Sequence, residues 1–273
     1  MGQFNFFEIE KQSENRTATV YLNGPDARNS MVWDFWKELP ELVDYLERDS
    51  NIKCVVIASR KKSFSIGLEL NEFGEKFGDI IQGATADKRM EFLALIQQMQ
   101  SGFIKMMNSR IVFIGAVHKH CIGGALDLIC ACDLRLAAQD ASVSLRETKV
   151  AIVADMCSLN RLPSIIGQGN TRLMAFTGSD YSATKCQDMG LFSELYPDQE
   201  SLHQAAQNMA TEVAANPGIV LRGVKEQLNY MERHTPEEGL NYVAVWNAAF
   251  LDSEDFRELQ SAFKERRRPQ YKS

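Results

Sequence analysis

The stretch that decides the fold is Ile111–Ala137, which reads IVFIGAVHKHCIGGALDLICACDLRLA. Its first seven residues form an apolar run, which predicts a buried strand. The paired glycines Gly123 and Gly124 follow, then an apolar segment that predicts a helix, and then a strand over residues 133–137. A strand, a glycine turn, a helix and a second strand in this order indicate an α/β architecture.

The chain on either side of this stretch divides into two regions. Before it, the sequence predicts strands at residues 17–23 and 54–59 and helices at residues 31–47 and 87–107, with Pro40 as a bend or break in the first helix. After about Ser182 the pattern is nearly continuous helix, in segments 198–215, 217–231, 236–250 and 253–267. We therefore expect an α/β core over residues 1–195 and a helical region over residues 196–273.

Composition excludes several classes of protein. The chain has 273 residues, of which 45% are hydrophobic and 24% charged, as in ordinary globular proteins. Its net charge of -6 argues against nucleic-acid binding. We see no signal peptide and no apolar stretch of membrane-spanning length, so we expect a cytoplasmic protein that does not bind membranes. The six cysteines form no CxxC pair and predict reduced core thiols and no metal site.

Three short segments combine residue types that are suited to catalysis. In FSIGLEL, residues 64–70, Gly67 lets the backbone turn and point an N–H at a ligand, although a simple turn is the commoner reason for such a glycine. In CIGGALD, residues 121–127, glycines open a helix and expose N–H donors that suit an anion, although close packing explains them equally well. In residues 146–155, Glu147 and Asp155 flank an apolar stretch, where surface acids are the alternative.

These segments, in this order and spacing, resemble the crotonase (enoyl-CoA hydratase/isomerase) family. FSIGLEL is similar to the family's FSxGxDL segment, and CIGGALDL to its GGGxDL segment. RETKVAIVADMCSLNRLPSIIG resembles the segment that carries the second acid. Further matches are LNGPDARNSM, ATKCQDMGLFSELYP and LDSEDFRELQSAFKERRRP, so the likeness extends from about Thr17 to Pro269.

The resemblance implies a core of repeated ββα units in a spiral, followed by a C-terminal helical region that forms trimers or hexamers. It also implies an acyl-coenzyme A thioester as the substrate, with no separate cofactor. The thioester oxygen would lie between the N–H groups of Leu68 and Gly124, which form an oxyanion hole. The adenine region would lie near residues 25–28, and the basic run at residues 264–268 would contact phosphate, from a neighbouring subunit where it reaches the site. The expected substrate-binding residues are Asp26, Arg28, Ile66, Gly67, Leu68, Glu69, Leu70, Gly123 and Gly124.

The acids narrow the reaction further. Asp127 and Glu147 match the family's two catalytic acid positions, and Asp155 lies eight residues after Glu147, where many hydratases have a small residue. An aspartate, a glutamate and an aspartate at these positions resemble the Δ3,5-Δ2,4-dienoyl-CoA isomerases, which move a proton from C2 to C6. The resemblance implies Glu147 and Asp155 as the proton-transfer pair, with Asp127 assisting. Burial and mutual repulsion in such a group raise the pKa of at least one carboxyl.

Two alternatives remain open at this level. One is an enoyl-CoA hydratase that uses Asp127 and Glu147 and has no need of Asp155. The other is a relative of low activity that binds acyl-CoA. Lys119, Ile66 and Cys157 stand where the family usually has small residues, and these departures bear on the shape of the acyl pocket.

Overall fold

The computed structural model describes residues 4–272 and centres on a six-stranded sheet with the order β1-β2-β3-β4-β6-β9. β1 pairs antiparallel with β2, and every other neighbouring pair is parallel. The strands are β1 (Phe7–Gln12), β2 (Thr17–Leu22), β3 (Cys54–Ser59), β4 (Val112–Val117), β6 (Leu134–Ala138) and β9 (Glu194–Tyr196). A smaller sheet joins β5 (His120–Ile122), β7 (Ser142–Ser144) and β8 (Tyr181–Ser182).

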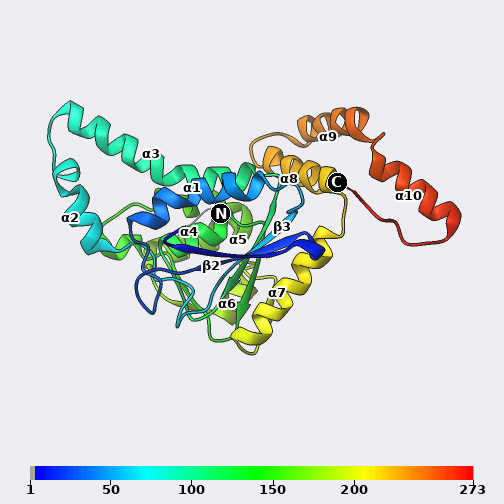
Figure 1. Ribbon diagram of the computed structural model, residues 1–273. Coiled ribbons are helices and arrows are strands. Elements are labelled where there is room, and N and C mark those ends of the chain that lie inside the picture. Colours follow the sequence, from blue (N-terminus) through cyan, green and yellow to red (C-terminus); the bar gives the residue numbers. More distant parts are fainter. Residues whose placement is uncertain (1–3, 273) are drawn as a thin grey trace.

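Helices cover both faces of the main sheet, which explains why every residue of β2, β3 and β4 is buried. On one face lie α1 (Trp33–Glu47), α3 (Ala86–Asn108), α4 (Gly124–Ala131) and α5 (Ser158–Thr177) (Figure 1). On the other lies α7 (Gln199–Ala214), which buries Leu202, Ala206, Ala210 and Ala214 against the strands. Their spacing of four residues forms one apolar stripe, and the alanines let the helix approach the sheet closely.

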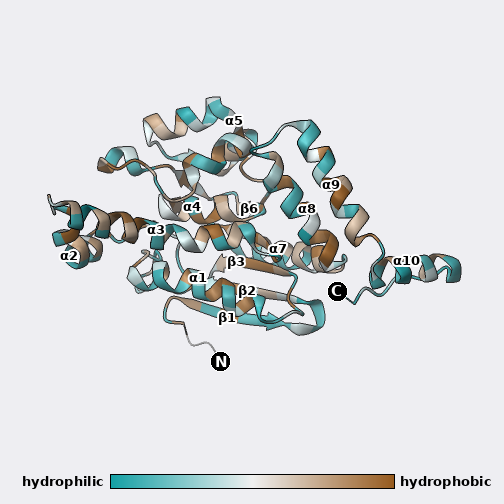
Figure 2. Cartoon of the chain, turned by 90° about the horizontal axis from the view of Figure 1, so that it is seen from above, coloured by the Kyte–Doolittle hydropathy of each residue, from teal (hydrophilic) through white to brown (hydrophobic). Residues whose placement is uncertain are grey.

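One helix projects from this core at one end, and three helices project from it in the opposite direction (Figures 1 and 2). At one end lies α2 (Leu70–Ile81), which has no buried residue. At the other lie α8 (Gly218–Met231), α9 (Pro236–Phe250) and α10 (Glu254–Glu265). A short helix, α6 (Ala183–Asp188), and two 3-10 turns, η1 (Ser13–Asn15) and η2 (Glu147–Val150), complete the chain.

The predicted α/β class and the predicted long helices and strands are confirmed, and the differences are local. Pro40 lies inside α1 without ending it, because the helix is held by a buried face that includes Trp36 and Leu39. Two helices were not predicted: α2, which begins at Leu70, and α5. The region expected to be nearly all helix contains β9, a short strand that exists because it pairs with β6.

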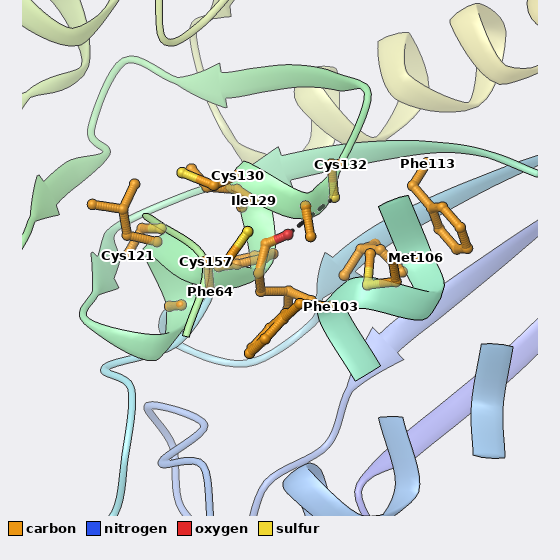
Figure 3. Close-up of a cluster of buried hydrophobic side chains, with 14 of the residues drawn as sticks. Phe64, Phe103, Met106, Phe113, Cys121, Ile129, Cys130, Cys132 and Cys157 are labelled. Atoms are coloured by element: carbon orange, nitrogen blue, oxygen red, sulfur yellow. Dashed lines mark hydrogen bonds between the residues drawn. The ribbon is translucent and has the colours of Figure 1, made fainter. Parts of the chain in front are cut away.

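The cysteines lie in the core as free thiols, as the sequence predicts. All six are buried and none forms a disulfide. Figure 3 shows Cys121, Cys130, Cys132 and Cys157 around α4, among aromatic and methionine side chains. Burial raises the pKa of each of the six thiols, which keeps them protonated and unreactive at neutral pH.

No helix among residues 4–272 combines the length and the apolar character that a membrane span needs.

Candidate active site

The first loop of the site follows β3 and turns sharply at Gly67. The φ angle of Gly67 is +81°, and a Cβ at this position would lie 2.4 Å from the carbonyl oxygen of Ile122. Only glycine therefore fits. The carbonyl of Gly67 accepts from the N–H of Met31 at 2.8 Å, and the N–H of Glu69 donates to Met31 at 3.1 Å. These bonds fix the backbone on both sides of Leu68.

The second loop leads from β5 into α4. Gly123 has φ +56° and ψ −120°, and its N–H donates to the carbonyl of Ser144 at 3.0 Å. Gly124 is the first residue of the helix. A Cβ on Gly124 would lie 3.1 Å from both the Met31 sulfur and the Trp36 ring, so a larger residue has no room. The N-terminus of α4 is thus held in place by packing rather than by a cap.

The two loops bring two free N–H groups together. Among the loop and cap hydrogen bonds of residues 4–272, none is donated by the N–H of Leu68 or of Gly124. The loops touch, since a Cβ on Gly67 would lie 3.1 Å from the nitrogen of Gly124. Gly124 also carries the positive end of a helix dipole. The predicted pair of donors is therefore adjacent and unoccupied by protein groups, which is the arrangement that an oxyanion requires.

Glu147 lies against Gly123, the residue that precedes one of the two donors. It begins η2 after β7, and its Oε1 would lie 3.1 Å from a Cβ on Gly123. Its Oε2 is buried and has no hydrogen-bond partner among residues 4–272. Burial, and then the charges of Asp127 and Asp155, raise the pKa of Glu147 to about 7. A carboxyl with this pKa can accept or give a proton at neutral pH.

Asp127 lies three residues into α4 from Gly124 and is buried. Its Oδ1 accepts from the N–H groups of Cys157 at 2.9 Å and Ser158 at 2.6 Å. Burial raises the pKa of Asp127, while the N–H bonds from Ser158 and Cys157 oppose the rise. This carboxylate is thus bound to the start of α5.

Asp155 lies in the loop just before α5 and is half-buried. Its backbone carbonyl accepts from Nε2 of Gln100 at 2.5 Å. Burial raises the pKa of the Asp155 carboxyl, and the Asp155 charge in turn raises the pKa values of Asp127 and Glu147. The contacts of the chain therefore place the three predicted acids around the start of α4: Glu147 lies against Gly123, Asp127 lies on the first turn, and Asp155 precedes by two residues Cys157, whose N–H binds Asp127.

Other predicted residues surround the first loop without contacting the acids. Asp26 is engaged in its own turn, where it accepts from the N–H groups of Arg28 at 2.6 Å and Ser30 at 3.3 Å. The carbonyl of Arg28 accepts from Ile66 at 3.2 Å, which places this turn against the Gly67 loop. Glu69 caps α2 by accepting from the N–H of Glu72, and Leu70 is the first residue of that helix.

The basic run at residues 264–268 lies far from these loops within one chain. It stands at the end of α10, across the molecule from α2 (Figures 1 and 2). Arg267 already pairs with Glu258 at 2.5 Å and Glu265 at 2.6 Å. A phosphate contact from this run to the site therefore requires a second subunit.

The sequence marked Lys119 as a departure from the family pattern, whereas no motif marked Gln100 as a residue of the site. Lys119 adopts φ +53°, a glycine-like backbone, and its side chain pairs with Asp140 at 3.0 Å on the surface. It therefore leaves Gly124 undisturbed. No sequence motif identified Gln100, because it is one polar residue on a long amphipathic helix. The packing of α3 brings its side chain to the backbone carbonyl of Asp155.

Comparisons with known proteins agree with this geometry. Residues 12–273 match the family model described as Enoyl-CoA hydratase/isomerase. The chain is 34% identical to the mitochondrial Delta(3,5)-Delta(2,4)-dienoyl-CoA isomerase of Dictyostelium discoideum, over 98% of this chain and 92% of the relative. It is 35% identical to the mitochondrial Delta(3,5)-Delta(2,4)-dienoyl-CoA isomerase of Homo sapiens, over 86% of this chain and 72% of the relative.

A solved structure shows the same fold. The enoyl-CoA hydratase of Bacillus anthracis superposes with a TM-score of 0.86 at 24% identity, over 98% of this chain and 99% of that one.

Proposed function

The chain belongs to the enoyl-CoA hydratase/isomerase family, and from that premise we propose that it isomerises a 3,5-dienoyl-CoA to the 2,4-dienoyl-CoA. This is chemistry of the fatty-acid β-oxidation type. One observation carries the proposal: Asp155 lies two residues before Cys157, whose N–H binds Asp127, while Glu147 lies against Gly123 at the start of the same helix α4. The relatives named as dienoyl-CoA isomerases support the same reaction.

The proposed mechanism moves a proton from C2 to C6 of the acyl chain. The N–H groups of Leu68 and Gly124 bind the thioester oxygen and stabilise the enolate that forms when the C2 proton leaves. Glu147, beside Gly123, lies at the thioester end and exchanges the proton at C2. Asp155 exchanges the proton at C6. The pKa of about 7 for Glu147 supports this role, because the group changes protonation state at neutral pH with little cost.

A comparison of two substrates tests the proposal. Purified protein is assayed spectrophotometrically with a 3,5-dienoyl-CoA and with a 2-enoyl-CoA of the same chain length. We expect the dienoyl substrate to be converted with the higher kcat/KM. Turnover of the 2-enoyl substrate alone would support the hydratase alternative, and binding without turnover of either would support the low-activity relative.

The hydratase alternative uses Asp127 and Glu147 alone, so Asp155 is the residue that distinguishes the two reactions. Oδ1 of Asp127 accepts two backbone N–H groups at the start of α5, and the comparison of the two substrates decides between the reactions.

The coenzyme A moiety is proposed to lie along the loop Ile66–Leu70, with its adenine near Asp26 and Arg28. The contact between the Arg28 carbonyl and Ile66 supports a continuous surface there. The thioester is the substrate, and no further cofactor is needed for the proton transfer. Acyl-CoA affinity that is unchanged after joint neutralisation of Arg266, Arg267 and Arg268 would refute a phosphate contact from the basic run.

A homotrimer, or a hexamer of two trimers, is proposed as the working assembly. Large apolar side chains on α8, α9 and α10 are exposed in the single chain, among them Leu228 at 65%, Leu240 at 70% and Phe263 at 84%. Large apolar side chains exposed on three successive helices are typical of a surface that another subunit covers. Light scattering at micromolar concentration checks the mass, and a monomer contradicts the proposal.

The cytoplasmic location expected from the sequence also stays a proposal. Relatives named as mitochondrial and as peroxisomal make cell fractionation the measurement that decides it.

A further inference from the structure

A polar cleft begins at the segment that carries Asp155. Its volume is about 900 Å³, and α3, α5, α8 and α9 supply its walls. Met156 and Cys157, which directly follow Asp155, line the cleft together with Gln100, whose Nε2 donates to the Asp155 carbonyl at 2.5 Å. The cleft therefore opens next to the acid that is proposed to exchange the proton at C6.

The cleft leads from Asp155 along α3 to α8. At its near end Gln100 holds the Asp155 carbonyl, and further along the Cys157 sulfur lies 4.0 Å from the Met107 sulfur. The carbonyl of Met107 then accepts from Nδ2 of Asn229, on α8, at 2.8 Å. A helix rises about 1.5 Å per residue, so the α3 wall from Gln100 to Met107 is about 10 Å long. An acyl chain that places C6 at Asp155 therefore has room to continue into this cleft.

The far end of the cleft carries guanidinium groups. Arg161, on the first turn of α5, pairs through Nη1 with Glu232 at the C-terminus of α8, and 16% of the Arg161 side chain is exposed. Its Nε is buried and has no hydrogen-bond partner among residues 4–272. Arg233 follows Glu232 directly and lines the same cleft, and within this part of the chain its side chain has no carboxylate partner. A buried donor without an acceptor is costly, which indicates that a ligand supplies the acceptor.

The lysine and the second glutamate that line the cleft are neutralised within the chain. Nζ of Lys225 lies 2.9 Å from Oδ2 of Asp133, and Glu226 accepts from Nε of Arg222 at 2.6 Å. The ion pair between α5 and the end of α8 likewise has no net charge. The charge of Arg233 is therefore the surplus of the cleft, and it favours an anion.

We propose that the preferred 3,5-dienoyl-CoA carries a carboxylate at the far end of its acyl chain, and that Arg161 and Arg233 select it. The inference rests on the proposed isomerase function and names the class of its substrate. A carboxylate offers an acceptor to the unpaired Nε of Arg161 and a counter-charge to Arg233. A chain that ends in a methyl group offers neither, and it covers polar groups without pairing them. The proton transfer between C2 and C6 is the same for both chains.

Two pairs of ligands test the proposal. Purified protein is assayed with two 3,5-dienoyl-CoA substrates of equal carbon number, one ending in a carboxylate and the other in a methyl group. It is also titrated calorimetrically with the two corresponding saturated acyl-CoA esters, which have no diene to isomerise. The variants are Arg233→Met and Arg161→Lys, which keeps a charge for Glu232 but removes the Nε donor. Arg172→Met, at an exposed position of the same helix α5, is the control.

For the wild type we expect kcat/KM to be higher for the carboxylate substrate by roughly tenfold to a hundredfold, the typical effect of a hydrogen bond between charged groups. Arg233→Met should reduce this ratio by about tenfold and leave the methyl substrate nearly unaffected. The change should appear in KM with kcat nearly constant, because the far end of the chain is bound equally before and during the reaction. Arg161→Lys should reduce the ratio by less, and Arg172→Met should leave it unchanged.

Equal kcat/KM values for the two substrates with the wild type, or a preference for the methyl substrate, would overturn the proposal. A preference for the carboxylate that persists in both Arg233→Met and Arg161→Lys would also overturn it, and Arg233→Met alone decides if Arg161→Lys does not fold. If neither dienoyl substrate is converted, the proposed function fails. The calorimetric comparison of the two saturated esters then still decides whether the cleft selects a carboxylate.

Discussion

At the scale of single residues, burial gives two acids of the site different properties from those of surface carboxyls. Oε2 of Glu147 is buried without a partner, and the pKa of Glu147 is raised to about 7. Asp155 is half-buried, and burial raises its pKa as well. Desolvation penalises the charged form of each group, so a proton is available near neutral pH.

The substitution Asp155→Asn should abolish isomerisation of a 3,5-dienoyl-CoA and leave KM largely unchanged. Asparagine keeps the shape of the side chain but cannot relay a proton, and such a group typically contributes roughly a hundred- to ten-thousand-fold. Steady-state kinetics give the two constants. Asp140→Asn is a suitable control, because Asp140 pairs with Lys119 on the surface. Near-normal turnover of Asp155→Asn on the dienoyl substrate would leave the hydratase alternative.

The substitution Glu147→Gln should stabilise the protein at neutral pH while removing activity. The pKa of Glu147 is raised from 4.5 to about 7 on folding, so the folded state binds the proton more tightly between those values. Stability from this group is therefore present below pH 4.5 and is lost as the pH rises to about 7. The loss is up to roughly 3 kcal/mol before solvent screening reduces it.

Thermal unfolding of the wild type and of Glu147→Gln at pH 5 and pH 8 checks this sign. The Tm difference in favour of Glu147→Gln should be larger at pH 8. A difference that is larger at pH 5, or a glutamine variant that is less stable at pH 8, would show that Glu147 is not held in a desolvated site.

At the scale of elements, the contact of α7 with the sheet contains one buried histidine, His118, and one half-buried histidine, His203. His118 follows β4 and donates through Nε2 to the carbonyl of Lys61 at 2.9 Å, while its Nδ1 has no partner among residues 4–272. His203 on α7 lies 6.2 Å away between ring centroids and 6.1 Å from the ring of Tyr21. Burial, and then the charges of His118 and Arg60, lower the pKa of His203 to about 4.

Acid should therefore loosen α7 from the sheet. A histidine whose pKa is lowered on folding is neutral in both states above about pH 6.5, and the unfolded state gains the proton first as the pH falls. Stability should decline between about pH 6.5 and pH 4. His203→Gln should flatten that decline, as measured by urea unfolding at several pH values, whereas the exposed His234 replaced by Gln should not. If the stability of wild type and of His203→Gln declined in parallel as the pH falls, the two histidines would not be the cause of the decline.

At the scale of the whole molecule, a buried lysine joins the C-terminal helices to the core. Nζ of Lys225, on α8, donates to the carbonyls of Met106 at 2.9 Å and Ile111 at 2.8 Å and pairs with Asp133 at 2.9 Å. Only 6% of Lys225 is exposed. Removing one member of a buried ion pair leaves an uncompensated charge, which typically costs about 3–5 kcal/mol.

The substitution Lys225→Met should therefore lower the Tm by roughly 6–12 °C, since about 3 kcal/mol corresponds to that shift in a chain of this size. Lys37→Met, at an exposed position on α1, is the control. Calorimetry of both variants, at the same protein concentration to hold any assembly constant, gives the comparison. A shift no larger than that of the control would mean that α8 is held by its apolar contacts alone.

The pattern of residues along the chain determined the α/β class, the long helices and the central strands. Runs such as CVVIAS and IVFIGAV are long enough and apolar enough to require burial on both faces, wherever their neighbours lie. Local chemistry left the roles of Gly67 and Gly124 open, since a turn or close packing explains such glycines as well as a donor site does. The resemblance of their segments to the family's implied the donor role and the three acids.

Only the tertiary structure decided which short elements form and how the three acids differ in burial and in hydrogen-bond partners. The strand β9 exists through its pairing with β6, and no local pattern within a few residues can encode a partner more than fifty residues away. The hydrogen bonds of Asp127 to the start of α5 and of Gln100 to the carbonyl of Asp155 also join segments that lie far apart in sequence. Burial that raises the pKa of Glu147 to about 7 is a property of the folded site, because desolvation is absent from the extended chain.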